Sequence, residues 1–277
     1  MKTRVQQLSA VVTISSSLVL SSPGAAGSLV PDFNLCVTAS GAGQCGPTCD
    51  DVFPTFEAAA AGAALLPDIE GVRPWVVICL APGEPHFENI DVDNGAGVLG
   101  DPLTLDLEDE YLCPDPASAD DQPVINFVPG PSFRPDGVDR GRIDLTPSGP
   151  CTSGPRPGIR YSGDHQAFMG QGGLIAGTRG YAIKHTGVGN GVDGSASLVV
   201  FHWALASCTG TAISAGPFLS LRNVQVLSCG ADDSHLHDGN VALVAGSDEV
   251  VVQDSIFLGN TIGGRSGSDD ALAIGDI

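Results

Sequence analysis

The chain has 277 residues, of which 32 are acidic and 12 are basic, so its formal net charge is −20. A nucleic-acid-binding protein needs a basic surface, and we therefore exclude electrostatic binding to nucleic acid. The same charge predicts poor binding to an anionic polysaccharide unless Ca²⁺ bridges the two. The 37 glycines and 20 prolines indicate many turns and short strands rather than long helices.

Residues 1–26 have the pattern of an export signal. Lys2 and Arg4 are followed by an apolar stretch over 8–20, which is too short to span a bilayer, and by small residues at 24–26. The serines in the apolar stretch leave a frayed first helix as the alternative. We expect cleavage after Ala26 and a mature chain that is secreted or displayed at the cell surface, without a transmembrane segment or a lipid anchor.

The eight cysteines fit an oxidising compartment, because disulfides persist outside the reducing cytosol. No CxxC pair occurs, so a zinc site is not expected. We expect a Cys/Gly-rich lead-in over 27–52 that is held by a local disulfide. The disulfide candidates are Cys36 and Cys49 in this lead-in, where Cys45 is a further possible partner, Cys113 with Cys151, and Cys208 with Cys229.

A single helix is expected over residues 55–66. Thr55 can cap its N-terminus, an alanine-rich run follows, and Pro67 ends it. The next element is a strand over 75–80, rich in Val and Ile and stopped by the turn Pro82-Gly83.

This opening resembles that of pectin-lyase-like proteins. The resemblance lies in Phe53-Pro54-Thr55-Phe56-Glu57-Ala58-Ala59, in Val76-Val77-Ile78-Cys79-Leu80-Ala81-Pro82-Gly83 and in Phe87-Glu88-Asn89-Ile90. It implies an all-β chain folded as a right-handed parallel β-helix (a solenoid), whose first rung is covered by a short N-terminal capping helix. Independently, the open end of a parallel stack has unpaired backbone groups and needs such a cover. The resemblance implies nothing about activity.

A short phrase recurs in the last third of the chain, at Ala182-Ile183, Ala212-Ile213, Ala242-Leu243 and Ala271-Leu272. These positions are 30, 30 and 29 residues apart, which indicates one unit stacked on copies of itself. We therefore expect a β-helix domain over 53–277, with regular rungs over 172–277. The stretch 100–170 is expected to form irregular rungs or a small inserted subdomain.

The rungs also resemble repeats of the polymorphic outer-membrane protein type. Gly172-Gly173-Leu174-Ile175 is similar to the first motif of that family and Phe257-Leu258-Gly259-Asn260 to its second. Cys208 and Cys229 stand where this second motif has Asn, and they share a column in adjacent rungs. A disulfide between them is the favoured prediction, and a stacked pair of buried free thiols is the alternative.

One polar cluster follows the Cys229 rung. Asp232, Asp233, His235 and His237 could bind a metal there, with Ca²⁺ as the cation suited to its carboxylates. Solvated loop residues of an acidic protein are the alternative.

The same region is similar to polygalacturonases. His237-Asp238-Gly239 and Ser268-Asp269-Asp270-Ala271-Leu272-Ala273-Ile274 match parts of their motifs. The resemblance implies that Asp269 or Asp270 is the general acid and that Asp238 helps to activate water. The chain lacks the Asn-Thr that precedes this Asp in the family, and it lacks the later Gly-His-Gly and Arg-x-Lys motifs.

Three functions follow from these patterns. The leading one is a non-enzymatic surface or extracellular protein that recognises a glycan or a cell-surface partner. The second is a polysaccharide hydrolase or lyase. The third is a structural segment of a longer chain, because Ala271-Leu272 begins a rung close to Ile277 and would leave an open strand edge. Such an edge also favours end-to-end self-association.

Overall fold

The computed structural model describes residues 33–37, 49–67, 76–83, 85–93, 103–128, 136–163, 166–187, 197–215, 218–230, 243–245 and 249–260. Within these ranges the chain is all-β apart from one short helix, α1 (Phe56–Ala63). The strands are β1 (Phe33–Val37), β2 (Asp51–Phe53), β3 (Val76–Leu80), β4 (His86–Phe87), β5 (Ile90–Asp93), β6 (Leu103–Asp106), β7 (Leu112–Cys113), β8 (Ile125–Val128), β9 (Asp136–Asp144), β10 (Ile159–Tyr161), β11 (Gln166–Ala176), β12 (Tyr181–His185), β13 (Ser197–Phe201), β14 (Trp203–Ala206), β15 (Thr211–Ala215), β16 (Phe218–Arg222), β17 (Gln225–Leu227), β18 (Leu243–Ala245), β19 (Glu249–Gln253) and β20 (Ile256–Leu258).

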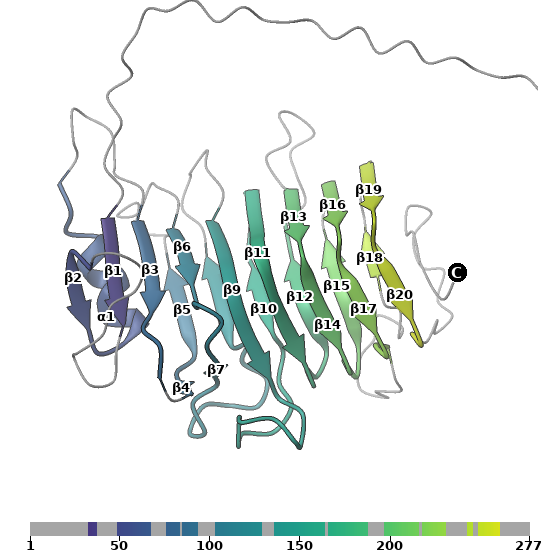
Figure 1. Cartoon of the computed structure of the whole chain (residues 1–277), viewed down its shortest axis with the longest axis horizontal. Helices are drawn as coiled ribbons and strands as arrows, with labels where there is room; N and C mark the ends of the chain where they lie inside the picture. The colour runs from purple at the N-terminus through teal and green to yellow at the C-terminus, as the bar shows by residue number, and fades with distance from the viewer. Residues whose placement is uncertain are drawn as a thin grey trace, which may run out of the picture.

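The strands form stacked parallel sheets (Figure 1). The large sheet has 12 strands, with the order β19-β16-β13-β11-β9-β6-β3-β1-β2 and with β14, β17 and β20 continuing it beside β11. Behind it lies a sheet of 6 strands in the order β18-β15-β12-β10-β8-β5. From β3 onward, successive passes of the chain therefore add strands to both sheets, and the inner strands pair with their equivalents on either side. We call each such pass a repeat.

The register confirms the spacing read from the recurring phrase. Ile183 of β12 pairs with Ile213 of β15, and Ile213 pairs in turn with Leu243 of β18. The fourth copy, Ala271-Leu272, lies outside the described residues. The 30-residue spacing is thus the length of chain that returns a strand to the same place in the next layer.

Equivalent strands of the large sheet are aligned in the same way. Val200 pairs with Leu221, and Leu221 with Val252. The inward-facing aliphatics Val200 and Leu221 are fully buried, whereas Val252, in the last described layer, is 36% exposed. The core is therefore a set of aliphatic columns, each buried by the repeats on both sides of it.

At the N-terminal end, α1 packs against the first strands, as Figure 1 shows. Thr55 is its N-cap as predicted, and its side chain accepts a hydrogen bond from the Ala58 amide at 3.1 Å. The Glu88 carboxylate accepts hydrogen bonds from the backbone amides of Phe56 and Glu57 at 2.9 and 3.0 Å. Thr55 and Glu88 together thus provide acceptors for the amides of the first turn, which have no partner within the helix. The helix ends at Ala63, three residues before the predicted end, because the last turn tightens into a Leu65 N–H to Gly62 O bond.

The sheet begins before residue 53. β1 comes from the Cys/Gly-rich lead-in and pairs along its whole length with β3, and β2 pairs with β1 on its other side. The predicted disulfide Cys36–Cys49 is present and joins β1 to the residue that precedes β2 by two positions. The lead-in is therefore part of the stack, joined to it by backbone pairing and by a covalent link.

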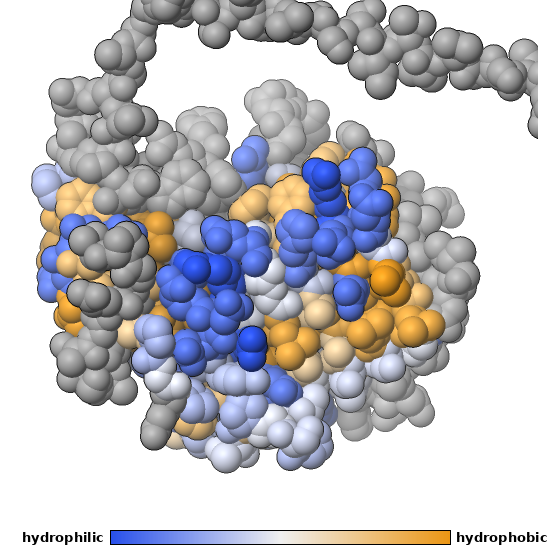
Figure 2. Space-filling view, viewed as in Figure 1, coloured by the Kyte–Doolittle hydropathy of each residue, from blue (hydrophilic) through white to orange (hydrophobic). Residues whose placement is uncertain are grey.

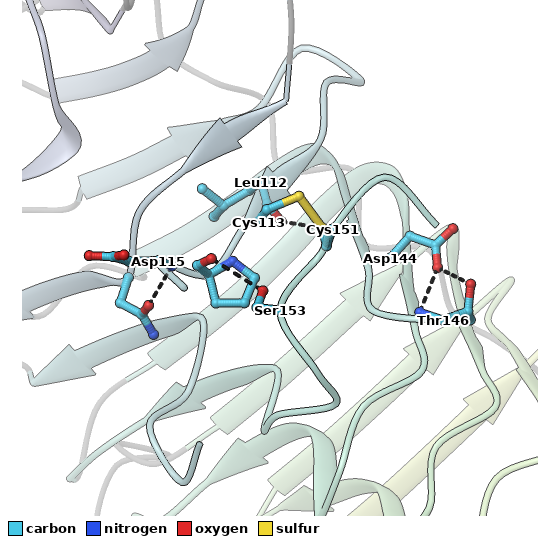
Figure 3. Close-up of a disulfide and its surroundings, with 9 residues drawn as sticks. Leu112, Cys113, Asp115, Asp144, Thr146, Cys151 and Ser153 are labelled. Atoms are coloured by element: carbon cyan, nitrogen blue, oxygen red, sulfur yellow. Dashed lines mark hydrogen bonds between the residues drawn. A yellow bond between two sulfur atoms is a disulfide. The ribbon is translucent and has the colours of Figure 1, made fainter. Parts of the chain in front are cut away.

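The stretch over 100–170 continues the stack through β6, β8, β9 and β10. The strands of this stretch lie within the two sheets. The predicted disulfide Cys113–Cys151 is present (Figure 3), with a sequence separation of 38 residues. Nearby, the Ser153 hydroxyl donates to the Pro114 carbonyl at 3.3 Å, so the loop is held at two points.

The predicted disulfide between Cys208 and Cys229 is wrong for this structure, in which both are buried free thiols. They do share a column, and each thiol lies near the carbonyl two residues before it, at 3.8 Å from Ala206 O and 3.7 Å from Leu227 O. The next layer places Asn260 in the same column, where its Oδ1 accepts from the Cys229 amide at 2.9 Å. The two thiols also hydrogen-bond to each other, so the alternative of a stacked pair of buried free thiols applies.

Candidate functional site

The site residues proposed from the sequence lie outside the described part of the chain. Asp232, Asp233, His235, His237 and Asp238 fall within 231–242, and Asp269 and Asp270 fall within 261–277. Among the residues that the structure does describe, no group of three or more His, Cys, Asp and Glu side chains is arranged to hold a metal ion. The same residues contain no helix long and apolar enough to cross a membrane.

The described part offers another candidate, at the corner where the long strands of the large sheet bend. Four residues at this corner have left-handed backbone angles: Gln171 (φ 57°), His202 (φ 61°), Asn223 (φ 54°) and Asp254 (φ 51°). All four are exposed, and they come from consecutive repeats. We call them the corner strip. A left-handed residue turns the chain sharply, so the corner recurs in each layer and its side chains point to solvent in a row.

Hydrogen bonds order part of the corner strip. Asn223 Nδ2 lies 2.7 Å from His202 Nδ1. Because an amide nitrogen can only donate, Nδ1 accepts and the ring proton lies on Nε2, where it is available to a partner. Gln171 donates from Nε2 to Asp139 Oδ2 at 3.2 Å, which leaves its carbonyl oxygen outward as an acceptor.

Two aromatic side chains lie beside the corner strip. Phe168 in β11 alternates with the buried Ala167 and Met169, so its ring is on the outer face of the sheet, where it is half-buried. Phe201 is also half-buried, and its ring centroid is 5.6 Å from that of Phe168 at an angle of 59°. Trp203, in contrast, is in the core and is 1% exposed.

On the same outer face of the sheet, in the two preceding repeats, lies a charged cluster that joins β6 to β9. Arg140 donates from Nε to Asp106 Oδ1 at 3.1 Å, from Nη2 to Asp106 Oδ2, and from Nη2 to Glu108 Oε1 at 2.8 Å. This fork is the bidentate geometry that makes arginine–carboxylate pairs strong. Figure 2 shows the resulting hydrophilic patch over β6 and β9 and a hydrophobic area around β20.

Asp139 is the residue of this cluster whose titration is most clearly altered. Burial raises the pKa of the Asp139 carboxyl, and the charge of Asp106 on the neighbouring strand raises it further. Hydrogen bonds from the Gly170 amide at 3.0 Å and from Gln171 act in the opposite direction. Hydrogen bonding to Asp106 raises the pKa of the Arg140 guanidinium, which therefore keeps its charge.

The two aspartates are nevertheless poorly placed to reach a substrate. Asp106 and Asp139 are only 8% and 9% exposed, and protein donors occupy both oxygens of each. A β-carbon on Gly170 would lie 2.4 Å from a Phe168 ring atom and 2.8 Å from Asp139 Oδ1, so the ring lies close to this carboxylate. The cluster therefore braces the sheet, and the exposed groups of the corner strip beside it are the ones available to a partner.

Sequence reasoning missed this surface. The polar residues of the corner strip are of four different types, so no repeated letter marks them. The signal that could have found them is their position. Each directly follows, or lies one residue beyond, a run of alternating buried and exposed residues, and these runs end at equivalent positions of the paired strands.

Comparison with family models, with curated proteins and with solved structures finds no match. The stacked parallel sheets agree with the β-helix that the sequence resemblance implies, and no relative adds a function to it.

Proposed function

We propose that this protein is an exported right-handed parallel β-helix of the pectin-lyase-like kind and that it binds an extended glycan along the corner strip without cleaving it. The single observation that supports this most directly is the row of exposed amide, imidazole and carboxylate side chains beside two outward phenylalanine rings. Sugars present hydroxyl groups around apolar ring faces, so a row of this composition can match both.

The geometry of the row suits a linear chain. Neighbouring strands lie about 4.8 Å apart, so the corner strip offers one polar group at about that interval along the stack. A sugar unit in an extended polysaccharide has a similar length, and successive units would meet successive repeats. His202 and Asn223 are already hydrogen-bonded to each other, which lowers the entropy that binding would cost.

The test is binding to a panel of neutral and acidic polysaccharides by affinity electrophoresis and calorimetry. We expect one linear glycan to bind, and the Phe168→Ala/Phe201→Ala variant to weaken that binding by about tenfold or more. Phe87→Ala is the matched control, because Phe87 is 44% exposed and lies on β4, away from the corner strip. Melting curves of all variants separate loss of binding from loss of fold.

Two results would contradict the proposal. One is the absence of binding to every glycan by the folded wild type. The other is an equal loss of affinity in the Phe87 variant, which would place the contact elsewhere.

A hydrolase or lyase is the second candidate, and it rests on the similarity of the sequence around Asp238, Asp269 and Asp270 to polygalacturonase motifs. Release of reducing or unsaturated sugars by the wild type, lost in Asp270→Asn, would support catalysis at the residues predicted from the sequence.

A further inference from the structure

Cys208 and Cys229 lie in one column of the stack, at the corner that follows β14 and β17. Ala206 pairs with Leu227, and each of these residues precedes a cysteine by two positions. The Gly230 amide donates to the Cys208 carbonyl at 3.0 Å, so the pairing of the two repeats continues past the cysteines. Both thiols are free and fully buried, and they hydrogen-bond to each other. Two sulfur donors therefore face each other across adjacent repeats.

The spacing of the stack explains why the two sulfur atoms are not joined. Residues stacked directly in neighbouring parallel strands lie about 4.8 Å apart. The β-carbons of a disulfide lie about 3.5–4.5 Å apart, so a bond between Cys208 and Cys229 requires the two repeats to move together. An ion between the sulfur atoms fits this spacing better, because two metal–thiolate bonds of about 2.3 Å in line span about 4.6 Å.

The preceding repeat contributes a buried hydroxyl to the same column. Thr178 lies two residues after Ala176, which pairs with Ala206, and it is fully buried. Its Oγ1 has no partner within hydrogen-bond distance, but it lies near enough to the Cys208 sulfur to favour the thiolate form. A buried hydroxyl without a partner costs free energy, and a negatively charged sulfur beside it supplies the missing acceptor.

The following repeat closes the column from the other side. Asn260 Oδ1 accepts from the Cys229 amide at 2.9 Å, and Nδ2 donates to the Val226 carbonyl at 2.9 Å. Backbone groups thus engage both ends of this amide, so Asn260 covers the thiols and is not a ligand. The groups available to an ion are two sulfur atoms and one hydroxyl.

We propose that Cys208 and Cys229 bind one soft monovalent metal ion, such as Cu(I), between their sulfur atoms. Thiolates select soft ions, and two ligands in line suit an ion of this class. Zn²⁺ takes four ligands, and Ca²⁺ and Mg²⁺ take oxygen ligands. On binding, two S–H bonds break, two sulfur–metal bonds form and two protons pass to solvent. The bound site carries one negative charge, to which the Thr178 hydroxyl donates.

The site lies one residue below the surface. Ser207 and Ser228, which directly precede the cysteines, are exposed and have left-handed backbone angles (φ 53° in both). A left-handed residue turns the chain sharply, and here it directs the following side chain into the stack. An ion has only this corner of the chain to pass, whereas an alkylating reagent needs far more room.

The experiment titrates the full chain with Ag(I), a redox-inert ion of the same charge and class, in chloride-free buffer. Native mass spectrometry counts the bound ions and calorimetry measures the affinity. We expect one ion per chain and a melting temperature that rises with Ag(I), because an ion that binds only the folded state stabilises it. Cys208→Ala and Cys229→Ala should each abolish the binding and this rise. No glycan is involved, so the result is independent of the proposed function.

Met169→Leu is the matched control, because Met169 is a buried sulfur-containing residue of β11 outside this column, and the change conserves volume. It should leave the binding of Ag(I) unchanged. Thr178→Val keeps both ligands but removes the hydroxyl, and it should weaken the affinity by about tenfold. Melting curves without Ag(I) establish that each variant is folded.

Three results would overturn the proposal. The first is the absence of binding by the folded wild type. The second is binding that persists in both cysteine variants and is lost in His235→Ala/His237→Ala, which would place the ion at the cluster predicted from the sequence. The third is Zn²⁺ bound as tightly as Ag(I), because such binding requires more ligands than two sulfur atoms.

Discussion

Asp106 and Asp139 are partners in the parallel register of β6 and β9, and both carboxylates leave the sheet on its outer side. Arg140, the residue after Asp139, turns back to Asp106 because its backbone is left-handed, with φ 42°. One aspartate is thereby paired with a cation, whereas the other is held by an amide and by Gln171. Two identical residues in one column thus have different electrostatic surroundings.

The first prediction concerns the pH dependence of stability due to Asp139. Its pKa in the folded protein is raised above the ordinary value of 3.8, so the folded state keeps this proton to a higher pH than the unfolded chain does. Between those two values the free energy of unfolding falls as pH rises. Asp139→Asn removes this dependence, so the stability of the variant relative to wild type should increase from about pH 3 to pH 7.

Urea unfolding at a series of pH values measures that difference. Asp91→Asn serves as the control, because it removes an exposed carboxylate of the other sheet. If both variants gained equally with pH, the effect would come from overall charge and not from the buried position of Asp139.

The second prediction concerns the hydrogen bonds from the Arg140 guanidinium to Asp106 and Glu108. Arg140→Gln leaves the side chains of Asp106 and Glu108, which are 11% and 19% exposed, without their cation. Mostly buried carboxylates that lose a charged partner destabilise a fold, so we expect a loss of about 1–3 kcal/mol. Arg142→Gln, two residues on in the same strand, should cost about 1 kcal/mol or less, since its guanidinium is exposed over the Tyr111 ring. Equal losses in the two variants would contradict the assigned role of Arg140.

Sequence reasoning found the elements whose signal is local or periodic. The cap at Thr55, the strand β3 and the 30-residue spacing from Ile183 to Ile213 all rest on such signals. It did not find the pairing of Asp106 with Asp139, because that register depends on connections of unequal length. In the large sheet the spacing between paired residues is 31 from Leu219 to Val250 and 21 from Leu198 to Leu219.

Disulfide prediction from the sequence succeeded at two pairs and failed at one. Cys36–Cys49 and Cys113–Cys151 are present, whereas Cys208 and Cys229 share the expected column as free thiols. Column position sets how close two side chains come, but the rotamer decides whether the sulfur atoms meet. The sequence indicates the column in which a cysteine lies but not the rotamer of its side chain.

The third prediction concerns the close packing of Gly173. A β-carbon there would lie 2.5 Å from ring atoms of Trp203 and 2.6 Å from the Gly141 carbonyl oxygen. Both neighbours belong to the packed interior, so Gly173→Ala should destabilise the fold by about 1–3 kcal/mol. Gly154→Ala is the control, because a β-carbon at that position has no heavy atom within 4 Å, and its effect should stay below about 1 kcal/mol. Denaturation midpoints compare the two, and an equal effect would show that Trp203 can move away at little cost.

The fourth prediction ranks Cys113–Cys151 against Cys36–Cys49 by the length of chain that each one closes. Cys113–Cys151 spans 38 residues and Cys36–Cys49 spans 13. In the chain-entropy treatment these loops correspond to about 4 and about 3 kcal/mol of stabilisation. Replacing each pair with alanines should therefore lower stability more for Cys113–Cys151, as measured by urea unfolding without reductant. The reverse order would show that local packing, and not loop closure, determines their contributions.

The last prediction concerns the thiols of Cys208 and Cys229. Both residues are fully buried. The hydrogen bond between the thiols, together with burial, raises the pKa of Cys208, and the same hydrogen bond lowers the pKa of Cys229. Burial nevertheless keeps both sulfur atoms out of reach of an alkylating reagent in solution. We therefore expect a maleimide to leave both residues unmodified in the native protein and to modify both once the protein is denatured without reductant. Peptide mapping by mass spectrometry reads out each site, and Cys208→Ser and Cys229→Ser confirm the assignment. Resistance to the maleimide after denaturation, relieved by a reductant, would mean that the protein made in an oxidising compartment joins the two as a disulfide.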